Sequence, residues 1–230
     1  MRPGQKVRKT PGPDFGVRVI QPTAALAGGG WWDDFGLIPC CVAAYQPKGA
    51  ASLAASYIDL SGSGNNAAPG VAPAWAAGIG WTFNGVNQFL TTGVVPGATY
   101  SLIVQHANST IDWRPVCGSM TNATTRFYVI PRSNANATTS YRWGATSVNI
   151  APATATGNLA ETPTTGYRNG VPHAALGGWV GLSVDDAYIG CFNNAGAAAS
   201  FYGGDVIALA LYSCNIDAWA AALAAWMAAI

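Results

Sequence analysis

Residues 80–92, which read GWTFNGVNQFLTT, constrain the fold of this chain more than any other stretch. Trp81 and Phe83 lie two residues apart, so both side chains face the same side of a strand. An Asn-Gly pair follows at positions 84–85. This pair is the strongest short-range signal for a two-residue hairpin turn, although the next two residues would allow a wider loop. Phe89 then begins a return strand. The stretch therefore predicts a β-hairpin with aromatic faces, against which later strands are built.

Further strand patterns follow along most of the chain. Alternating or continuous apolar runs predict strands at residues 37–45, 99–106, 114–120, 126–130, 140–143, 147–150, 179–184, 187–192 and 205–212. A second hairpin is predicted at Asn169-Gly170, and the Thr- and Ala-rich residues 151–163 are predicted to be a loop or a sheet edge. About twelve short strands with turn signals between them indicate a sandwich or barrel rather than alternating strands and helices.

One helix is predicted at the end of the chain. Asn215 can cap its N-terminus, and Asp217 places a negative charge in the first turn, where the helix dipole favours it. Apolar residues then recur at the spacing of one helix face: Ile216, Trp219, Leu223, Trp226, Met227 and Ile230. We expect this stripe to pack on the sheet core.

Residues 1–36 differ from the rest and predict an extended arm in front of a single domain at residues 37–230. Pro and Gly deny regular structure to most of this stretch, and five of the eleven basic residues lie in its first eighteen positions. The residues predicted to dock the arm on a partner are Arg2, Lys6, Arg8, Lys9, Trp31, Trp32 and Phe35. The three aromatic residues would anchor it, either on its own domain or on a neighbour.

Charge is sparse in this chain and limits what it binds. Only 9% of residues are charged, against roughly 25% in an average soluble domain. Such a surface repels its neighbours weakly, so we expect partners to cover part of it, or an extracellular setting. Nucleic-acid binding is not expected, because the basic cluster lacks interleaved aromatic residues and the body of the chain is slightly acidic.

The five cysteines leave the disulfide state open. They form no CxxC motif and have no His at metal-ligand spacing, so buried free thiols and a bridge such as Cys117–Cys191 both fit the sequence. No window reaches the roughly 18 apolar residues of a membrane span. The first residues contain no apolar stretch typical of a secretory signal, so neither a membrane span nor export by a signal peptide is expected.

Six short motifs follow one another in an order that points to a family. They are VAAY at 42–45, DLSGSGN at 59–65, WTFNGVNQFL at 81–90, GYRNG at 166–170, YIG at 188–190 and VIALALY at 206–212. In this order they resemble the laminin-G-like jelly rolls of the concanavalin A-like lectin/glucanase superfamily, of the kind found in tailed-phage virion proteins. The resemblance covers about residues 38–230. It implies an all-β fold, an antiparallel two-sheet jelly-roll sandwich, here with an N-terminal arm and one C-terminal helix.

Catalysis is not expected of this chain. Glucanases of the superfamily use a pair of glutamates, one as nucleophile and one as acid. This chain has one glutamate, Glu161, and its two histidines, His106 and His173, have no recognisable Ser or Asp partner nearby in the sequence.

A carbohydrate-binding role would need exposed aromatic residues beside Asn or Asp. The nine Trp supply aromatic side chains, and the candidate glycan or calcium loop is Asp185, Asp186, Asn193 and Asn194. No other metal or cofactor is expected. In this interpretation the chain is a lectin-like, extracellular module that attaches to cell-surface glycans.

The sequence favours a third interpretation, a non-catalytic structural protein of a virus (phage) particle. A capsid decoration, head-appendage or fibre protein would be made in the host cytoplasm, reside in the virion and need no export signal. Its partners would be other virion proteins or copies of itself, reached through the N-terminal arm.

Overall fold

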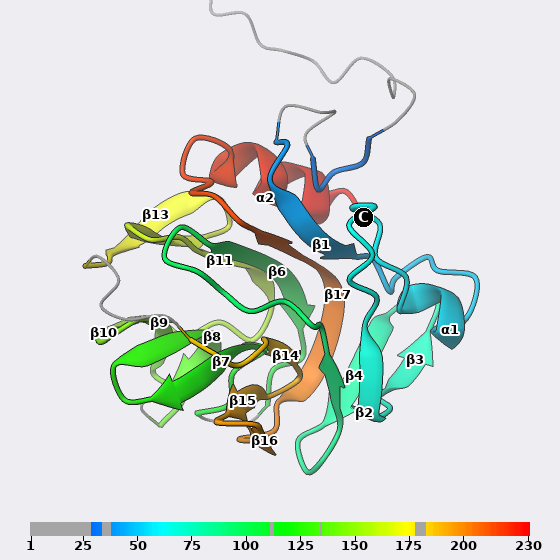
Figure 1. Cartoon of the computed structure of the whole chain (residues 1–230), viewed down its shortest axis with the longest axis horizontal. Helices are drawn as coiled ribbons and strands as arrows, with labels where there is room; N and C mark the ends of the chain where they lie inside the picture. The colour runs from blue at the N-terminus through cyan, green and yellow to red at the C-terminus, as the bar shows by residue number, and fades with distance from the viewer. Residues whose placement is uncertain (1–28, 34–37, 111–112, 134, 178–182) are drawn as a thin grey trace, which may run out of the picture.

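A computed structural model describes residues 29–33, 38–110, 113–133, 135–177 and 183–230. Its regular structure is mostly strand, in two sheets that face each other, and a C-terminal helix packs outside one of them (Figure 1). The predicted all-β, antiparallel two-sheet sandwich is therefore confirmed. Neither helix of the described ranges is long and apolar enough to cross a membrane.

The first sheet, called sheet A here, carries the helix. Its strands are, in order, β13 (Val171–Ala175), β12 (Thr165–Arg168), β11 (Gly157–Glu161), β6 (Ser101–Ala107), β17 (Gly203–Tyr212), β4 (Gly80–Asn84) and β3 (Ala74–Ala76). Strand β1 (Cys41–Tyr45) pairs with the C-terminal half of β17, while β4 pairs with its N-terminal half. The long strand β17 therefore joins both parts of the sheet.

The second sheet, sheet B, forms the other layer. Its strands are, in order, β10 (Thr146–Ile150), β9 (Thr138–Trp143), β8 (Thr125–Ser133), β7 (Cys117–Asn122), β14 (Tyr188–Ile189), β5 (Phe89–Thr91) and β2 (Ala68–Val71). A small hairpin of β15 (Phe192–Asn194) and β16 (Ala197–Ala199) adds to β7. The β15–β7 pair is parallel, and the other strand pairs among the described residues are antiparallel.

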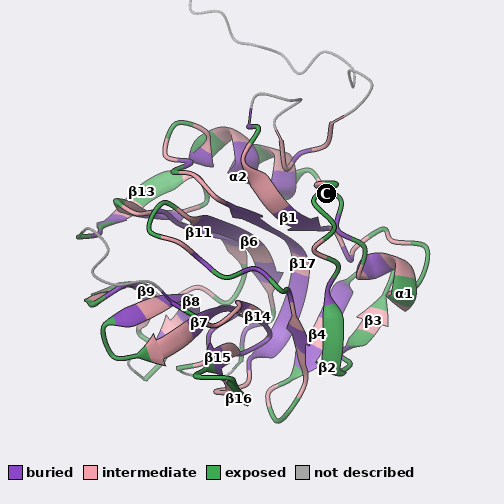
Figure 2. Cartoon of the chain, in the orientation of Figure 1, coloured by how far each residue is buried: buried purple, intermediate pink, exposed green. Residues whose placement is uncertain are grey.

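Two apolar cores lie on opposite sides of sheet A. On β6, Leu102 and Val104 point into the space between the sheets, whereas Ile103 points to the helix α2 (Ala220–Ala228). Figure 2 shows the resulting burial along β6 and β17 in the middle of the molecule. The alternation predicted for β6 is therefore correct, and both of its faces are buried.

The predicted apolar stripe of the C-terminal helix packs on sheet A as expected, but the helix begins later. It starts at Ala220 rather than beside Asn215, and its N-cap residue Trp219 makes no side-chain cap. Asn215 instead accepts a hydrogen bond from the Asp217 amide at 2.8 Å and closes a turn before the helix. Asp217 is not in the first helical turn; its carboxylate accepts hydrogen bonds from Thr162 and Tyr167, which tie this turn to β12.

The hairpin prediction is correct for one of the two Asn-Gly pairs and wrong for the other. Asn169 and Gly170 both adopt positive φ, 48° and 76°, and join β12 to β13 as the predicted hairpin. The hairpin predicted at Asn84-Gly85 is wrong, because β4 belongs to sheet A and β5 to sheet B. There the Asn84 side chain accepts hydrogen bonds from the Val86 and Asn87 amides and shapes an arch between the sheets.

Residues 151–163 contain a strand that the sequence analysis missed. Strand β11 lies inside sheet A, between β6 and β12. Its residues Asn158 and Glu161 are buried, so the Thr and Ala around them do not mark an edge. The strand predicted at 179–184 lies mostly outside the described residues.

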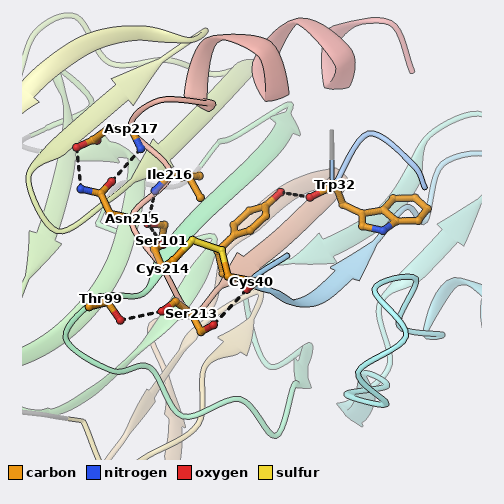
Figure 3. The surroundings of a disulfide bond; sticks show 10 residues. Trp32, Cys40, Thr99, Ser101, Ser213, Cys214, Asn215, Ile216 and Asp217 are labelled. Carbon is orange, nitrogen blue, oxygen red and sulfur yellow. Dashed lines mark hydrogen bonds between the residues drawn. A yellow bond between two sulfur atoms is a disulfide. The ribbon is translucent and has the colours of Figure 1, made fainter. Parts of the chain in front are cut away.

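The disulfide joins Cys40 to Cys214, not Cys117 to Cys191 (Figure 3). Cys117 and Cys191 are buried free thiols. The bridge links the start of β1 to the segment between β17 and α2, and the Ser213 amide also donates to the Cys40 carbonyl at 2.9 Å. Two segments that are 174 residues apart in the sequence are thereby held together.

The end of the predicted arm packs on its own domain. Trp31 is 7% exposed, lies in the core beneath α2, and donates from Nε1 to Gln46 at 3.0 Å. The Tyr212 hydroxyl donates to the Trp32 carbonyl at 2.7 Å (Figure 3). The other docking residues, Arg2, Lys6, Arg8, Lys9 and Phe35, lie outside the described residues.

Candidate functional site

A row of directly opposed residues crosses the outer face of sheet B. From β2 to β10 the row is Ala68, Thr91, Tyr188, Gly118, Tyr128, Arg142 and Ser147. Directly opposed residues project to the same face of a sheet. Their strand neighbours Leu90, Phe127 and Tyr141 lie in the core between the sheets, so the row faces away from that core.

Two aromatic stacks stand on this face. Phe89 stacks on Tyr188 with ring centroids 5.2 Å apart and planes 27° apart. Phe192 stacks on Tyr128 at 5.2 Å and 13°, and Phe201 lies 6.2 Å from Phe89. Four of these residues are half-exposed, and Tyr128 is 7% exposed. We call the five residues the aromatic face.

Gly118 sets the spacing of the two stacks. It lies on β7 between Tyr188 and Tyr128, so these tyrosines are two strands apart, roughly 10 Å. A Cβ at Gly118 would lie 2.1 Å from the Cβ of Tyr128. The missing side chain therefore allows the rings on either side of β7 to occupy one continuous surface.

Such a surface suits flat ligands that have apolar faces and polar edges. Half-exposed rings offer a large contact area together with electron-rich faces that attract polarised C–H groups. A contiguous aromatic patch on an exposed sheet face also marks a ligand or partner site more often than scattered apolar residues do.

Two arginines border the Tyr128 stack. Arg142 is opposite Tyr128 on β9, and Arg126 is two residues before Tyr128 on β8. Arg142 donates to Asn149 Oδ1 at 3.3 Å, and its guanidinium carbon lies 5.3 Å from the ring centroid of Trp113. Arg126 donates to the carbonyls of residues 144 and 145 at 3.2 and 2.9 Å.

These arginines lack a carboxylate partner among the described residues, because every acceptor they bond is a neutral oxygen. Burial lowers the pKa of Arg142; the Tyr128 hydroxyl and the buried Glu161 carboxyl oppose this shift, and the neighbouring Arg126 adds to it. The end of the aromatic face beside Tyr128 is therefore positively charged, and Arg142 is only 6% exposed. At the other end, burial raises the pKa of Tyr188, and the nearby charges of Asp186 and Asp185 add to this shift.

The residues of the predicted glycan or calcium loop have the following surroundings in the structure. Asp185 accepts a hydrogen bond from the Thr121 hydroxyl at 2.6 Å. Asp186 accepts one from Asn193 Nδ2 at 3.0 Å, so the structure brings these two predicted residues together. Asn194 is exposed at the turn of the β15–β16 hairpin. In the described ranges no three His, Cys, Asp or Glu side chains are grouped to hold a metal ion.

A pocket of about 270 Å³ lies elsewhere, beside the short helix α1 (Leu53–Ser56). Trp32, Ile58 and Leu60 give it an apolar lining. Its polar side chains, Gln46 and Ser56, already accept hydrogen bonds from Trp31 and Trp81. The pocket therefore presents few polar groups for orienting a hydrophilic ligand.

Two titratable side chains lie deep inside the sandwich. Glu161 is fully buried; burial raises its pKa well above the usual value, and the backbone and charge of Arg142 and the charge of Arg126 oppose this shift. His106 is fully buried as well, and burial, aided by the charge of Arg168, lowers its pKa to about 3. Neither group reaches the outer face of sheet B.

The sequence analysis did not single out the residues of this face. Aromatic residues on strands usually belong to the core, and only the register across seven strands shows which of them face outward. One signal was available: residues 113–160 contain Arg114, Arg126, Arg132 and Arg142 but no Asp or Glu.

The comparisons with known proteins concern the fold. Neither a protein-family model nor a curated protein sequence matches the chain. Among solved structures, it is similar to domain 4 of AbnA, a GH43 extracellular arabinanase from Geobacillus stearothermophilus, solved in complex with arabinotriose. The TM-score is 0.59 at 16% identity over 80% of this chain and 98% of that domain.

The chain is also similar to part of Trypanosoma rangeli sialidase. The structure of that enzyme with 2,3-difluorosialic acid gives a TM-score of 0.58 at 15% identity, over 82% of this chain and 33% of the sialidase chain. The present chain thus spans about a third of the enzyme. At these identities the likeness extends to the fold alone: the chain is a β-sandwich similar in fold to these two domains.

Proposed function

We propose that this protein is a non-catalytic carbohydrate-binding module that holds a glycan on the aromatic face of sheet B. The observation that carries the proposal is the pair of aromatic stacks on the outer face of sheet B, Phe89 on Tyr188 and Phe192 on Tyr128, in which every ring except that of Tyr128 is half-exposed. Rings about two strands apart match the repeating apolar faces of a sugar chain.

The similar structures and the disulfide support this proposal. The AbnA domain was solved with arabinotriose and the sialidase with a sialic acid derivative. The Cys40–Cys214 bridge fits an oxidising, extracellular compartment, where glycans of cell surfaces are met.

The absence of catalysis is part of the proposal. The single glutamate of the chain, Glu161, is buried between the sheets, so it is out of reach for a ligand on either outer face. A glycosidase of the two-carboxylate type would need two acids on either side of the scissile bond.

Glycan binding by three variants tests the proposal. Tyr188→Ala and Phe192→Ala each remove one ring from the stacks, and Trp219→Ala removes a half-buried ring beside α2 as the matched control. The expected result is binding by wild type and Trp219→Ala on a glycan array, with affinity reduced about tenfold or more in the other two. Thermal melts identify any variant that fails to fold. Equal binding by all three variants, or no glycan bound by wild type, would refute the proposal.

A second candidate is the structural role in a virus particle, with docking through residues 1–28. The observation that favours it is the position of Trp31 and Trp32 on the α2 side of sheet A, opposite the aromatic face. Trp31 and Trp32 therefore lie on the side of the sandwich that faces away from sheet B. A solution mass for the full chain beside a chain lacking residues 1–28 tests this role. Assembly that disappears on truncation supports it, and two equal monomers contradict it.

A further inference from the structure

The charge around the Tyr128–Phe192 stack points to the class of glycan. Arg126 lies two residues before Tyr128 on β8 and Arg142 lies directly opposite Tyr128 on β9, so both project from the outer face beside this ring. The charge of Arg126 contributes to the lowered pKa of Arg142. Among the described residues no carboxylate hydrogen-bonds to either guanidinium. The acid that acts electrostatically on both is Glu161, which is buried between the sheets and whose raised pKa favours its neutral form. Residues 113–160, which include strands β7 to β10, contain four arginines and no Asp or Glu, although the whole chain has a net charge of only +1.

A buried cation without an anionic partner is costly, because neutral oxygens replace only part of its hydration. Arg142 is 6% exposed and its Nε has no hydrogen-bond partner in the part of the chain that the structure describes. Arg126 is half-exposed and bonds only backbone carbonyls. An anion at this place would gain charge-assisted hydrogen bonds and relieve the repulsion between the two guanidinium groups.

The aromatic residues indicate which kind of ligand would carry the anionic group. Phe192 and Tyr128 stack beside the arginines, and Trp113, 42% exposed, lies over the guanidinium of Arg142. A small inorganic ion has no apolar face that could pack on these rings. A ring-shaped ligand with an attached carboxylate would use both the apolar faces and the charge.

We propose that this face selects acidic glycans, with the sugar ring on the Tyr128–Phe192 stack and its carboxylate bound by Arg126 beside Arg142. The inference rests on the proposed function and adds the chemical class of the ligand. The shared chemistry is a carboxylate on a sugar ring, which hexuronic acids and terminal sialic acids both supply.

Paired probes with and without the charge test the inference on the full chain. One pair is oligogalacturonides against their methyl esters, which have the same rings and linkages; the other is sialyllactose against lactose. The expected result is about tenfold or greater preference for the acidic member of at least one pair by calorimetry. This preference should shrink as salt rises, because the pair is partly exposed.

Charge-matched variants locate the effect. Arg126→Gln and Arg142→Gln should lose the preference while still binding the neutral probe, and Lys48→Gln, which removes the same charge beside the 270 Å³ pocket, should keep it. Equal affinity for acidic and neutral probes in wild type would overturn the inference and leave the carbohydrate-binding proposal standing. A preference that persists in both arginine variants would also overturn it. Binding of neither member of either pair would count against both proposals.

Discussion

Phe192 stacks on Tyr128 across an intervening strand. The two residues come from β15 and β8, which do not pair with each other; both pair with β7. The position between them is Gly118, directly opposite Tyr128. The two rings can stack because β7 has no side chain at that position. A substitution of Gly118 therefore tests the aromatic face without removing a side chain that would contact the ligand.

Gly118→Ala is expected to destabilise the fold by about 1–3 kcal/mol, because overpacking forces neighbouring groups to move. The new Cβ would lie 2.1 Å from Tyr128 Cβ and 2.2 Å from the Phe127 carbonyl oxygen. Glycan affinity should fall with the disturbed stack. Gly78→Ala is the matched control, since nothing lies within 4 Å of a Cβ there. Chemical denaturation of both variants measures the difference, and equal stabilities would contradict the role given to Gly118.

Removal of the disulfide is expected to lower the stability by about 2–5 kcal/mol. The double variant Cys40→Ser with Cys214→Ser opens a link across 174 residues and frees β1 from the segment that leads to α2. Cys41→Ser, at a half-buried free thiol beside the bridge, is the control. Dithiothreitol should lower the melting temperature of wild type and of the control but leave the double variant unchanged. A reductant effect of the same size in all three would show that this bridge is not what the reductant breaks.

Glu161→Gln is expected to change how stability depends on pH. Burial raises the pKa of Glu161, so the folded state holds its proton where the unfolded state releases it. The unfolding free energy is then greatest below the unfolded pKa of about 4.3 and falls by up to about 1.4 kcal/mol per pH unit as pH rises toward the folded pKa. Glutamine removes this loss, so the stability of the variant relative to that of wild type should increase as the pH rises above about 4.3.

The buried His106 has the opposite effect on how stability depends on pH, and it serves as an internal reference. Its pKa is lowered to about 3, so stability falls as pH drops below about 6.5, where the unfolded state takes up a proton. This contribution is present in wild type and in Glu161→Gln, and it cancels when the two are compared. Denaturation curves at several pH values provide the comparison, and parallel curves would refute the part assigned to Glu161.

Asp59→Asn is expected to cost about 2–4 kcal/mol, because hydrogen bonds to a charged acceptor are strong and an amide cannot replace all of them. The Asp59 carboxylate accepts from the Ala44, Ser61 and Asn65 amides and from the Ser61 hydroxyl at 2.9–3.0 Å. An asparagine turns one oxygen into a donor that faces other donors. Asp185→Asn should cost less, since its partner there, the Thr121 hydroxyl, can rotate to accept. Similar losses in thermal melts of the two variants would contradict this account.

The motif around Asp59 shows how well local patterns predicted structure. The stretch DLSGSGN folds as a loop held by its own aspartate, and the Asn169-Gly170 hairpin and the β9–β10 pair lie where alternation and turn residues placed them. Hydrogen bonds within a few residues decide these features, so a single sequence contains the necessary information.

The same reasoning failed at Asn84-Gly85. Trp81 and Phe83 do face one side of a strand, as predicted, and both are buried. A turn-forming pair of residues indicates that the chain bends there. Which strands the flanking segments pair with depends on partners that are distant in the sequence. Here β17 pairs with β4, while β14 and β2 pair with β5.

The sequence by itself determined that this chain is a β-sandwich or barrel with an apolar C-terminal helix, because residue alternation and turn chemistry are local properties. Only the tertiary structure decided which aromatic residues face outward, since the row from Ala68 to Ser147 depends on the register of seven strands. It also decided that Arg126 and Arg142 border one stack, and that Cys40 meets Cys214. Register and long-range pairing are set by the packing of the whole core, and a shift by one residue would turn the row inward.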